Sequence, residues 1–233
     1  MRLFAAIGIT LMLAGCVGGG GRMEDRERYN RAAGKPVANP SAVVKAELAF
    51  ARLAQEKGQW TAFRETAAND AVMFVPDLTN AQQWLKGKAD PAQAVEWQPH
   101  KISMSCDGSL AVSTGAWQAP NGTNGAFITI WRLENFGERH RGRDQKWKWV
   151  FDHGFPLDKP LEQPDFIETE VASCEGKPIY MTAIVGNPRF SNDRTLMWNA
   201  SSGQSGNRNL SVTFWNGKEL KTIINEDFAG PAS

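Results

Sequence analysis

Histidine and cysteine are scarce in this chain of 233 residues, which has three of each. Three cysteines are too few for a disulfide-rich scaffold or a four-cysteine zinc site, and three histidines are too few for most metal clusters. An excess of one charge is also missing, because 26 Lys and Arg residues are balanced by 25 Asp and Glu residues. That balance gives no electrostatic reason to expect DNA or RNA as a partner.

Motifs that hold cofactors or activate nucleophiles are missing as well. The sequence has no Gly-x-Gly-x-x-Gly loop, no P-loop and no Gly-x-Ser-x-Gly elbow, and no two histidines lie at metal-ligand spacing. We therefore expect no cofactor and no metal site. No internal repeat is evident either. The composition, with 42% hydrophobic residues, is that of an ordinary globular protein.

The first sixteen residues have the form of a targeting signal. Met1 and Arg2 give a short basic start, and residues 3–13 are a mostly apolar run too short to span a bilayer as a helix. Leu13-Ala14-Gly15-Cys16 then resembles the lipobox of bacterial lipoproteins, in which the signal peptide is cut before the cysteine and the thiol receives a diacylglycerol. The alternative is a buried apolar helix with an incidental cysteine, which the glycines at 18–21 would break.

The lipobox resemblance implies a location and a domain boundary. We expect a signal peptide over residues 1–15, followed over residues 16–40 by a flexible tether anchored in the membrane through a lipid on Cys16. Val17 follows this cysteine, where lipoproteins retained in the inner membrane have Asp. The expected location is therefore the cell envelope, at the outer membrane and facing the periplasm.

The lipobox resemblance also bears on the state of the other two cysteines. If the lipid occupies Cys16, Cys106 and Cys174 remain, and an oxidising periplasm favours a disulfide between them. The alternative is two buried free thiols. Neither residue lies in a Cys-x-x-Cys motif, so redox catalysis is not expected.

Helices are expected at the start of the globular region. Asn39-Pro40-Ser41 combines capping residues with a proline suited to a first turn, and apolar residues then recur at helical spacing as far as Gly58. The further elements predicted here are a short helix over 60–67, a strand over 71–75 and helical turns over 81–85 and 91–95.

Alternating segments joined by turn signals follow. Asp107-Gly108 and the Asn-Gly pairs at 121–122 and 124–125 are strong hairpin signals. The strands predicted are 100–106, 110–117, 126–133 and 145–152. Helices followed by such a meander predict an α+β fold in which the helices pack on an antiparallel sheet.

Strict alternation also predicts which side chains share a face of each strand. In the last strand, Trp149, Phe151 and His153 would lie together, so that His153 faces the same side as the tryptophan. In the first strand, His100 would share the face of Ile102.

Several fragments occur in an order that suggests a family. They are Met73–Pro76, Cys106–Val112, Gly115–Trp117, Ile130-Trp131 and Trp147–Asp152. With the two preceding helices, they resemble the nuclear-transport-factor-two-like superfamily, in particular its SnoaL-like and ketosteroid-isomerase-related branch. The resemblance covers residues 41–154 and implies a cone-shaped, curved antiparallel sheet packed on the N-terminal helices, with a pocket at the open end. The superfamily includes isomerases, dehydratases and non-catalytic binding domains, so this fold does not fix a function.

Residues 155–233 lie outside the resemblance and read as a β-rich C-terminal extension. Asn216-Gly217 is a hairpin signal between two of its strands. The strands predicted in the extension are 166–174, 195–200, 210–215 and 220–225.

Candidate catalytic groups are few. A steroid-isomerase-like site needs a carboxylate base in an apolar pocket and an oxyanion donor that is typically Tyr, and both tyrosines lie outside residues 41–154. The remaining base candidates are Asp70, His100 and His153. Each has an ordinary structural explanation, since Asp70 suits a turn and a histidine at a strand end is usually a hydrogen-bonded structural residue.

Nine tryptophans are the most distinctive feature of the composition. They can line a pocket for a flat apolar ligand, or they can fill the core. The pocket candidates are Trp60, Trp97, Trp117, Trp131 and Trp149.

The leading hypothesis is a lipid-anchored periplasmic domain that binds a small apolar ligand or a partner protein, without established catalysis. The alternative is a SnoaL-like isomerase, dehydratase or hydrolase that uses a pocket Asp or His as general base. A third reading is a structural envelope protein that acts through its β-rich extension. Cone-fold relatives often pair through the outer face of the sheet, so a homodimer is a further expectation.

Overall fold

The computed structural model of the chain describes residues 38–135, 145–176, 178, 187–203 and 206–229. These residues form a mixed α+β architecture, as predicted. Its helices are α2 (Pro40–Lys57), α3 (Gln59–Thr66) and α4 (Ala81–Leu85). No helix in these ranges is long and apolar enough to cross a membrane.

The strands form two sheets. The large sheet has seven strands in the order β2-β1-β6-β5-β4-β3-β7, and the small sheet has four in the order β11-β10-β9-β8. Neighbouring strands are antiparallel, except that β1 is parallel to β6 and β3 is parallel to β7. The large sheet contains β1 (Ala67–Phe74), β2 (Leu78–Asn80), β3 (Glu96–Met104), β4 (Leu110–Gln118), β5 (Asn124–Asn135), β6 (Gln145–Pro156) and β7 (Glu168–Val171). The small sheet contains β8 (Arg189–Phe190), β9 (Leu196–Ser202), β10 (Arg208–Trp215) and β11 (Leu220–Phe228).

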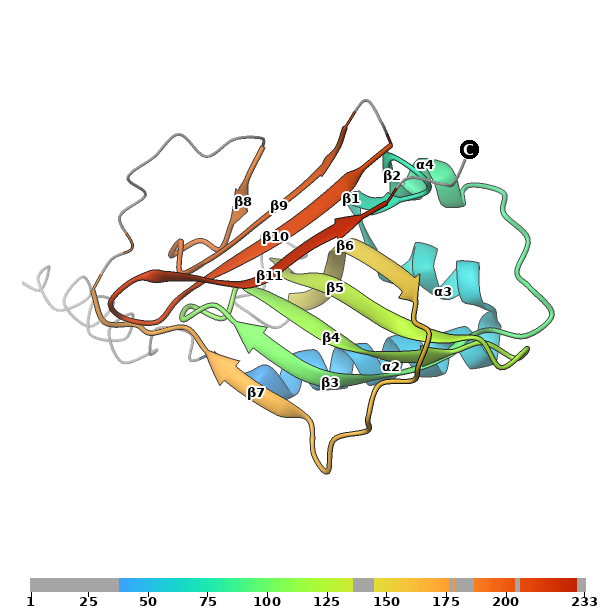
Figure 1. The fold of residues 1–233 in the computed structure, drawn as a ribbon, viewed down its shortest axis with the longest axis horizontal. Helices are drawn as coiled ribbons and strands as arrows, with labels where there is room; N and C mark the ends of the chain where they lie inside the picture. The colour runs from blue at the N-terminus through green and yellow to red at the C-terminus, as the bar shows by residue number, and fades with distance from the viewer. Residues whose placement is uncertain (1–37, 136–144, 177, 179–186, 204–205, 230–233) are drawn as a thin grey trace, which may run out of the picture. The chain divides into compact units, whose positions relative to one another are not determined.

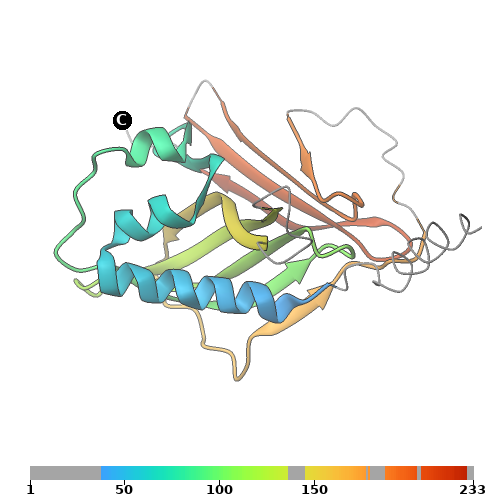
Figure 2. The same ribbon diagram turned by 180° about the vertical axis from the view of Figure 1, so that it is seen from behind.

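The two sheets and the helices are arranged in layers. Helices α2 and α3 lie against one face of the large sheet, here called the helix face, and the small sheet lies across the opposite face, here called the outer face (Figure 1 and Figure 2). On the helix face, the Nε1–H of Trp149 donates to Thr66 Oγ1 in α3 at 3.0 Å. On the outer face, the rings of Phe151 and Trp198 in β9 lie 5.7 Å apart. A homodimer through this outer face would have to displace the small sheet.

Helix α2 follows its sequence pattern with one exception. It begins at Pro40 and ends before Gly58, whose φ of 103° favours glycine. Its buried side chains are Val43, Glu47, Phe50 and Ala54, which is the spacing of a single helix face. Glu47 therefore occupies a position where the pattern calls for an apolar residue.

The prediction of a helical turn over residues 91–95 is wrong, because this segment has no regular secondary structure. The backbone groups of Val95 bind side chains of the helices instead of forming helical bonds. Its N–H donates to Gln59 Oε1 at 3.1 Å, and its carbonyl accepts from Gln55 Nε2 at 2.8 Å.

A β-bulge in β6 changes which side chains share a face. Trp149 pairs with Trp131 of β5, but Phe151 pairs with the very next residue, Ile130, so Val150 is an extra residue in the ladder. Trp149 consequently lies on the helix face and Phe151 on the outer face. The expectation that Trp149, Phe151 and His153 share one face is therefore wrong.

A second bulge occurs in β3. Pro99 pairs with Gly115 and Lys101 with the adjacent Thr114, which makes His100 the extra residue. His100 is therefore out of step with Ile102, which is buried on the helix face. The predicted sharing of a face by His100 and Ile102 is also wrong.

The β3–β4 and β8–β9 turns have the same sequence pattern, Ser-x-Asp-x-Ser/Thr-Leu, at residues 105–110 and 191–196. In both turns the aspartate Oδ1 accepts from the first Ser hydroxyl and from the backbone N–H two residues later. The turns also bind each other. The N–H of Asp107 donates to Asp193 Oδ2 at 2.8 Å, and the N–H of Asp193 donates to Asp107 Oδ2 at 3.0 Å.

The likeness extends to the strands around these turns. Strands β3–β6 are neighbours in chain order, and so are β8–β11. The third strand of each set, β5 or β10, binds the turn in the same way. The N–H of Leu133 in β5 donates to the Ser109 carbonyl, and the N–H of Trp215 in β10 donates to the Thr195 carbonyl. The described part of the chain therefore contains a structural repeat, which the sequence inspection missed because little more than the six-residue turn pattern is shared.

Cys106 and Cys174 form the predicted disulfide. These residues follow β3 and β7, the two strands that pair in parallel, so the bond joins the ends of that pair. Strand β7 belongs to residues 155–233 in sequence, yet it is an edge strand of the large sheet. The described residues all belong to one compact unit that starts at Pro36.

Candidate ligand-binding cavity

An aromatic cavity of about 260 Å³ lies between the helices and one end of the large sheet. Its lining includes side chains from all three helices and from strands of the large sheet. Trp60, Trp84, Trp97 and Trp117 of the lining are partly exposed, whereas Phe127 is buried, so the cavity leads from the surface into the core. The full lining is Phe50, Gln59, Trp60, Phe63, Met73, Phe74, Val75, Trp84, Val95, Trp97, Trp117, Phe127, Asp152, His153 and Gly154.

Glycines on the helix face make room for this cavity. A Cβ at Gly125 would lie 2.5 Å from the Trp117 ring, and one at Gly115 would lie 2.7 Å from the Phe127 ring. Trp117 therefore lies close over the sheet, and its Nε1–H donates to the Ala126 carbonyl at 2.9 Å. Without side chains at these positions, two aromatic rings can form the floor of the cavity.

Asp152 brings a carboxyl group to the cavity. It pairs with Thr129 of β5 on the helix face, and the Thr129 hydroxyl donates to Asp152 Oδ2 at 2.7 Å. Burial raises the pKa of Asp152 to about 7. The hydrogen bond from Thr129 lowers this pKa, and repulsion from Glu47 raises it by a smaller amount. A carboxyl group with such a pKa exchanges a proton near neutral pH.

Glu47 is a second buried carboxyl group beside the cavity wall. It accepts from Trp97 Nε1 at 2.9 Å, from Trp131 Nε1 at 2.8 Å and from Ser113 Oγ at 2.5 Å. Burial raises its pKa, although these hydrogen bonds act in the opposite direction. Glu47 thus fixes two tryptophans and a serine of the sheet against α2. Ser113 pairs with Thr129 on the neighbouring strand, so a row of polar groups links Glu47 to Asp152 across the sheet.

The five predicted pocket tryptophans have two different roles. Trp60, Trp97 and Trp117 line the cavity. Trp131 and Trp149 do not line it but are fully buried in the core, where their indole N–H groups bind Glu47 and Thr66.

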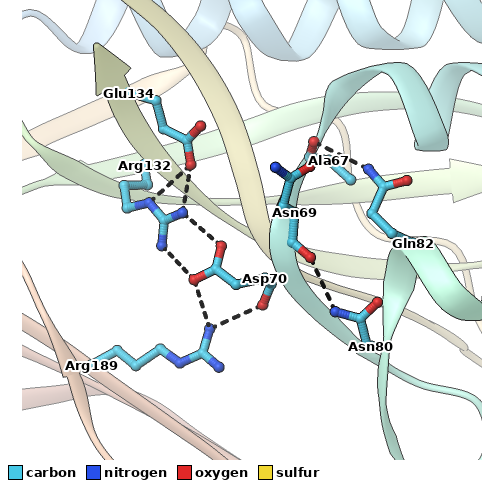
Figure 3. A network of polar contacts seen from close by, with 8 residues as sticks. All are labelled: Ala67, Asn69, Asp70, Asn80, Gln82, Arg132, Glu134 and Arg189. Carbon is cyan, nitrogen blue, oxygen red and sulfur yellow. Dashed lines mark hydrogen bonds and ion pairs between the residues drawn. The ribbon is translucent and has the colours of Figure 1, made fainter. Parts of the chain in front are cut away.

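Asp70 lies outside the cavity in a network of charged residues (Figure 3). Arg132 donates to both carboxylate oxygens of Asp70 at 2.9 and 2.7 Å, and Arg189 lies 4.0 Å away. The hydrogen bonds from Arg132 lower the pKa of Asp70. A carboxylate held in this way is a weak base, and its contacts instead connect β1, β5 and β8.

The rings of the two predicted histidines do not share the face of Asp152, although His153 is among the residues that line the cavity. His153 follows Asp152, so its ring projects to the outer face, where it lies 4.5 Å from the Phe228 ring and 5.1 Å from the Phe74 ring. Burial, with a smaller effect of Arg208, lowers the pKa of His153 to about 4. His100 lines a neighbouring polar pocket instead of this cavity.

Sequence reasoning did not select Asp152 or Glu47. Strict alternation along β6 favours His153 over Asp152, because an alternating pattern cannot show the bulge at Val150. Glu47 had a detectable signal, since it lies four residues after Val43 and three before Phe50 on the apolar face of α2.

Cys16, the predicted lipidation site, lies outside the described residues. Within the described ranges, no group of three or more His, Cys, Asp or Glu side chains is arranged to hold a metal ion. Comparison of the chain with protein-family models finds no match, and comparison with curated proteins finds none either. The function must therefore be argued from the cavity itself.

Proposed function

We propose that the protein binds a small, mostly apolar ligand with one hydrogen-bonding group in the aromatic cavity. The observation that carries the proposal is the carboxyl of Asp152 among aromatic walls. Aromatic rings supply apolar surface, and a single placed polar group fixes the orientation of the ligand. A dry cavity of about 150 Å³ can hold benzene, so about 260 Å³ suits a ligand of one or two rings.

Two probes that differ by one hydroxyl test this proposal. Toluene and p-cresol are titrated into the protein while tryptophan fluorescence is recorded, since four tryptophans line the cavity. We expect p-cresol to bind about 10-fold more tightly than toluene, because its hydroxyl bonds to Asp152. In Asp152→Leu this preference should disappear, whereas the exposed control Asp158→Leu should retain it. Failure of both probes to bind the unaltered protein would exclude the proposal.

A second candidate function is proton transfer, which the neutral-range pKa of Asp152 favours. In this reading Asp152 removes a proton from a carbon next to a ligand carbonyl and returns one from solvent, the chemistry of an isomerase. Incubation with the two-ring ketone 2-tetralone in D₂O tests it by NMR. Exchange at the α-carbon that is lost in Asp152→Asn would support catalysis, and exchange no faster than in buffer would leave binding as the function.

The fold adds an argument for the family resemblance. We propose that residues 41–154 belong to the nuclear-transport-factor-two-like group, with the large sheet as its cone. Helices on one face of a mainly antiparallel sheet, with a cavity between them, support this proposal.

We further propose that the domain works in the periplasm, tethered to the outer membrane by a lipid on Cys16. The support is the lipobox resemblance of Leu13–Cys16 and the Cys106–Cys174 disulfide, a bond typical of oxidising compartments. Membrane fractionation of Cys16→Ser tests the anchor. The variant is expected in the soluble fraction or unprocessed, and normal membrane partitioning would refute lipidation.

A further inference from the structure

A second pocket, of about 420 Å³, lies beside the aromatic cavity and shares Trp97 and Trp117 with it. The rest of its lining is mainly polar and comes from β3, β4, β5 and the segment after β6. The polar residues that line it are Glu96, Gln98, His100, Gln118, Asn124 and Gln163.

Two structural features bring these groups together. The bulge in β3 takes His100 out of step with the helix face. Asn124 pairs with Gln118 and precedes Gly125, which faces the helices, so the Asn124 side chain projects to the outer face. The N–H of Leu157 donates to the Asn124 carbonyl at 3.1 Å, which holds the start of the segment leading to Gln163 against this strand.

This pocket contains buried polar atoms without partners. Among the described residues, three buried side-chain polar atoms have no hydrogen bond, and two of them, His100 Nε2 and Asn124 Oδ1, belong to residues that line this pocket. An unpaired buried polar atom is costly, so both atoms call for a hydrogen-bonding group from outside the protein.

The chemistry of the pocket is polar and nearly uncharged. Three Gln residues and one Asn each offer both a donor and an acceptor, and burial lowers the pKa of His100, which keeps its imidazole neutral at pH 7. Glu96 is the one charged side chain of the lining among the described residues. An anionic ligand would find no opposite charge, because this lining contains no Lys or Arg.

We propose that this pocket binds a neutral, polyhydroxylated ligand of the saccharide type. Hydroxyl groups both donate and accept, so one ligand can satisfy the acceptor Asn124 Oδ1 and either protonation form of His100 Nε2. Trp97, Trp117, Pro160 and Leu161 also belong to the lining and add apolar surface for the C–H groups of a sugar. Asp152 is not part of this lining, although Trp97 and Trp117 also line the aromatic cavity.

Titration with glucose and maltose, followed by NMR of the His100 ring and the Asn124 side-chain amide, tests the proposal in the intact protein. We expect both signals to shift, with a dissociation constant of about 1–10 mM and tighter binding of the disaccharide. Glucose 6-phosphate should bind more weakly than glucose, because its charge is unpaired in the pocket. Absence of shifts up to about 50 mM sugar, or tighter binding of the phosphosugar, would overturn the proposal.

Matched variants assign the effect to the pocket. Asn124→Leu should weaken binding of maltose about 10-fold, because it removes the buried acceptor. Gln163→Ala, in an exposed segment where a folding defect is not expected, should weaken it about 3-fold. The exposed amide of Gln83 on α4 serves as control, and Gln83→Leu should bind like the unaltered protein. If all three variants bound maltose as tightly as the unaltered protein, the proposal would also be overturned. Asp152→Asn should change sugar binding less than about 2-fold, so failure of the aromatic cavity proposal leaves this result unaffected.

Discussion

The two faces of the large sheet are filled in different ways. On the outer face, aromatic rings from both sheets meet closely, with His153 lying 4.5 Å from Phe228 and Phe151 lying 5.7 Å from Trp198. On the helix face, the packing leaves about 260 Å³ open and buries two carboxyl groups, and among the described residues none of their hydrogen-bond partners is a cation. The close aromatic packing on the outer face therefore contributes stability, whereas the cavity and the two buried carboxyl groups on the helix face reduce it.

Asp152 and His153 show this contrast within two consecutive residues. Burial raises the pKa of Asp152 to about 7 and lowers the pKa of His153 to about 4. Both shifts keep the residue neutral inside the protein, but they give the stability opposite dependences on pH.

Removing an outer-face ring should cost more stability than removing a cavity ring. Trp198 is 2% exposed and packs on Phe151, so Trp198→Ala should lower the free energy of unfolding by roughly 3–5 kcal/mol. Trp60→Ala, at the partly exposed cavity wall, should lower it by about half as much or less while abolishing p-cresol binding. Urea unfolding followed by circular dichroism measures both losses. Equal losses would contradict the proposed difference between the faces.

Asp152→Asn should stabilise the protein at neutral and alkaline pH. In the folded protein Asp152 keeps its proton up to about pH 7, whereas the unfolded chain loses it near pH 4, so this residue makes stability fall as the pH rises between these values. The variant should gain roughly 2–4 kcal/mol at pH 8 and almost nothing at pH 4. Urea midpoints at pH 4, 6 and 8 report the gain, and a gain that is the same at every pH would rule out this explanation.

His153→Phe should have the reverse effect, with a smaller size. The unfolded chain takes up a proton at this residue below about pH 6.5, whereas the folded protein does so only near pH 4, so this residue makes stability fall as the pH is lowered through that range. Phe suits a site among Phe74, Phe155 and Phe228. The variant should gain roughly 1–3 kcal/mol at pH 4.5 and little at pH 8. A gain that increases with pH would contradict the assigned pKa shift.

The helices and hairpins could be predicted because their signals are local. Pro40 and Gly58 mark the limits of α2, and Asp107-Gly108 and Asn216-Gly217 mark turns of the two sheets. The disulfide could also be predicted, since Cys106 and Cys174 are the cysteines left once Cys16 is assigned to a lipid.

Which side chains of the large sheet lie on the helix face and which lie on the outer face could not be predicted. Both bulges depend on how two strands distant in sequence pair, and no residue in the 145–156 segment marks Val150 as the extra one. One such residue turns the Asp152 side chain to the helix face and the His153 ring to the outer face, although His153 is still among the residues that line the cavity, because a shift of one position reverses every later side chain. Strict alternation therefore selects His153 as a candidate base, one residue after Asp152, whose carboxyl group projects to the helix face.

The paired turns at Asp107 and Asp193 have a consequence for the order in which the chain is made. In each turn the aspartate Oδ1 accepts within its own turn, and Oδ2 accepts from the backbone N–H of the other aspartate, which lies 86 residues away. At about 5–20 residues per second, a ribosome needs roughly 4–17 s to deliver the second aspartate after the first. Until the second turn has been made, the N–H groups of Cys106 and Asp107 lack Thr195 Oγ1 and Asp193 Oδ2, the acceptors that they bind in the folded protein.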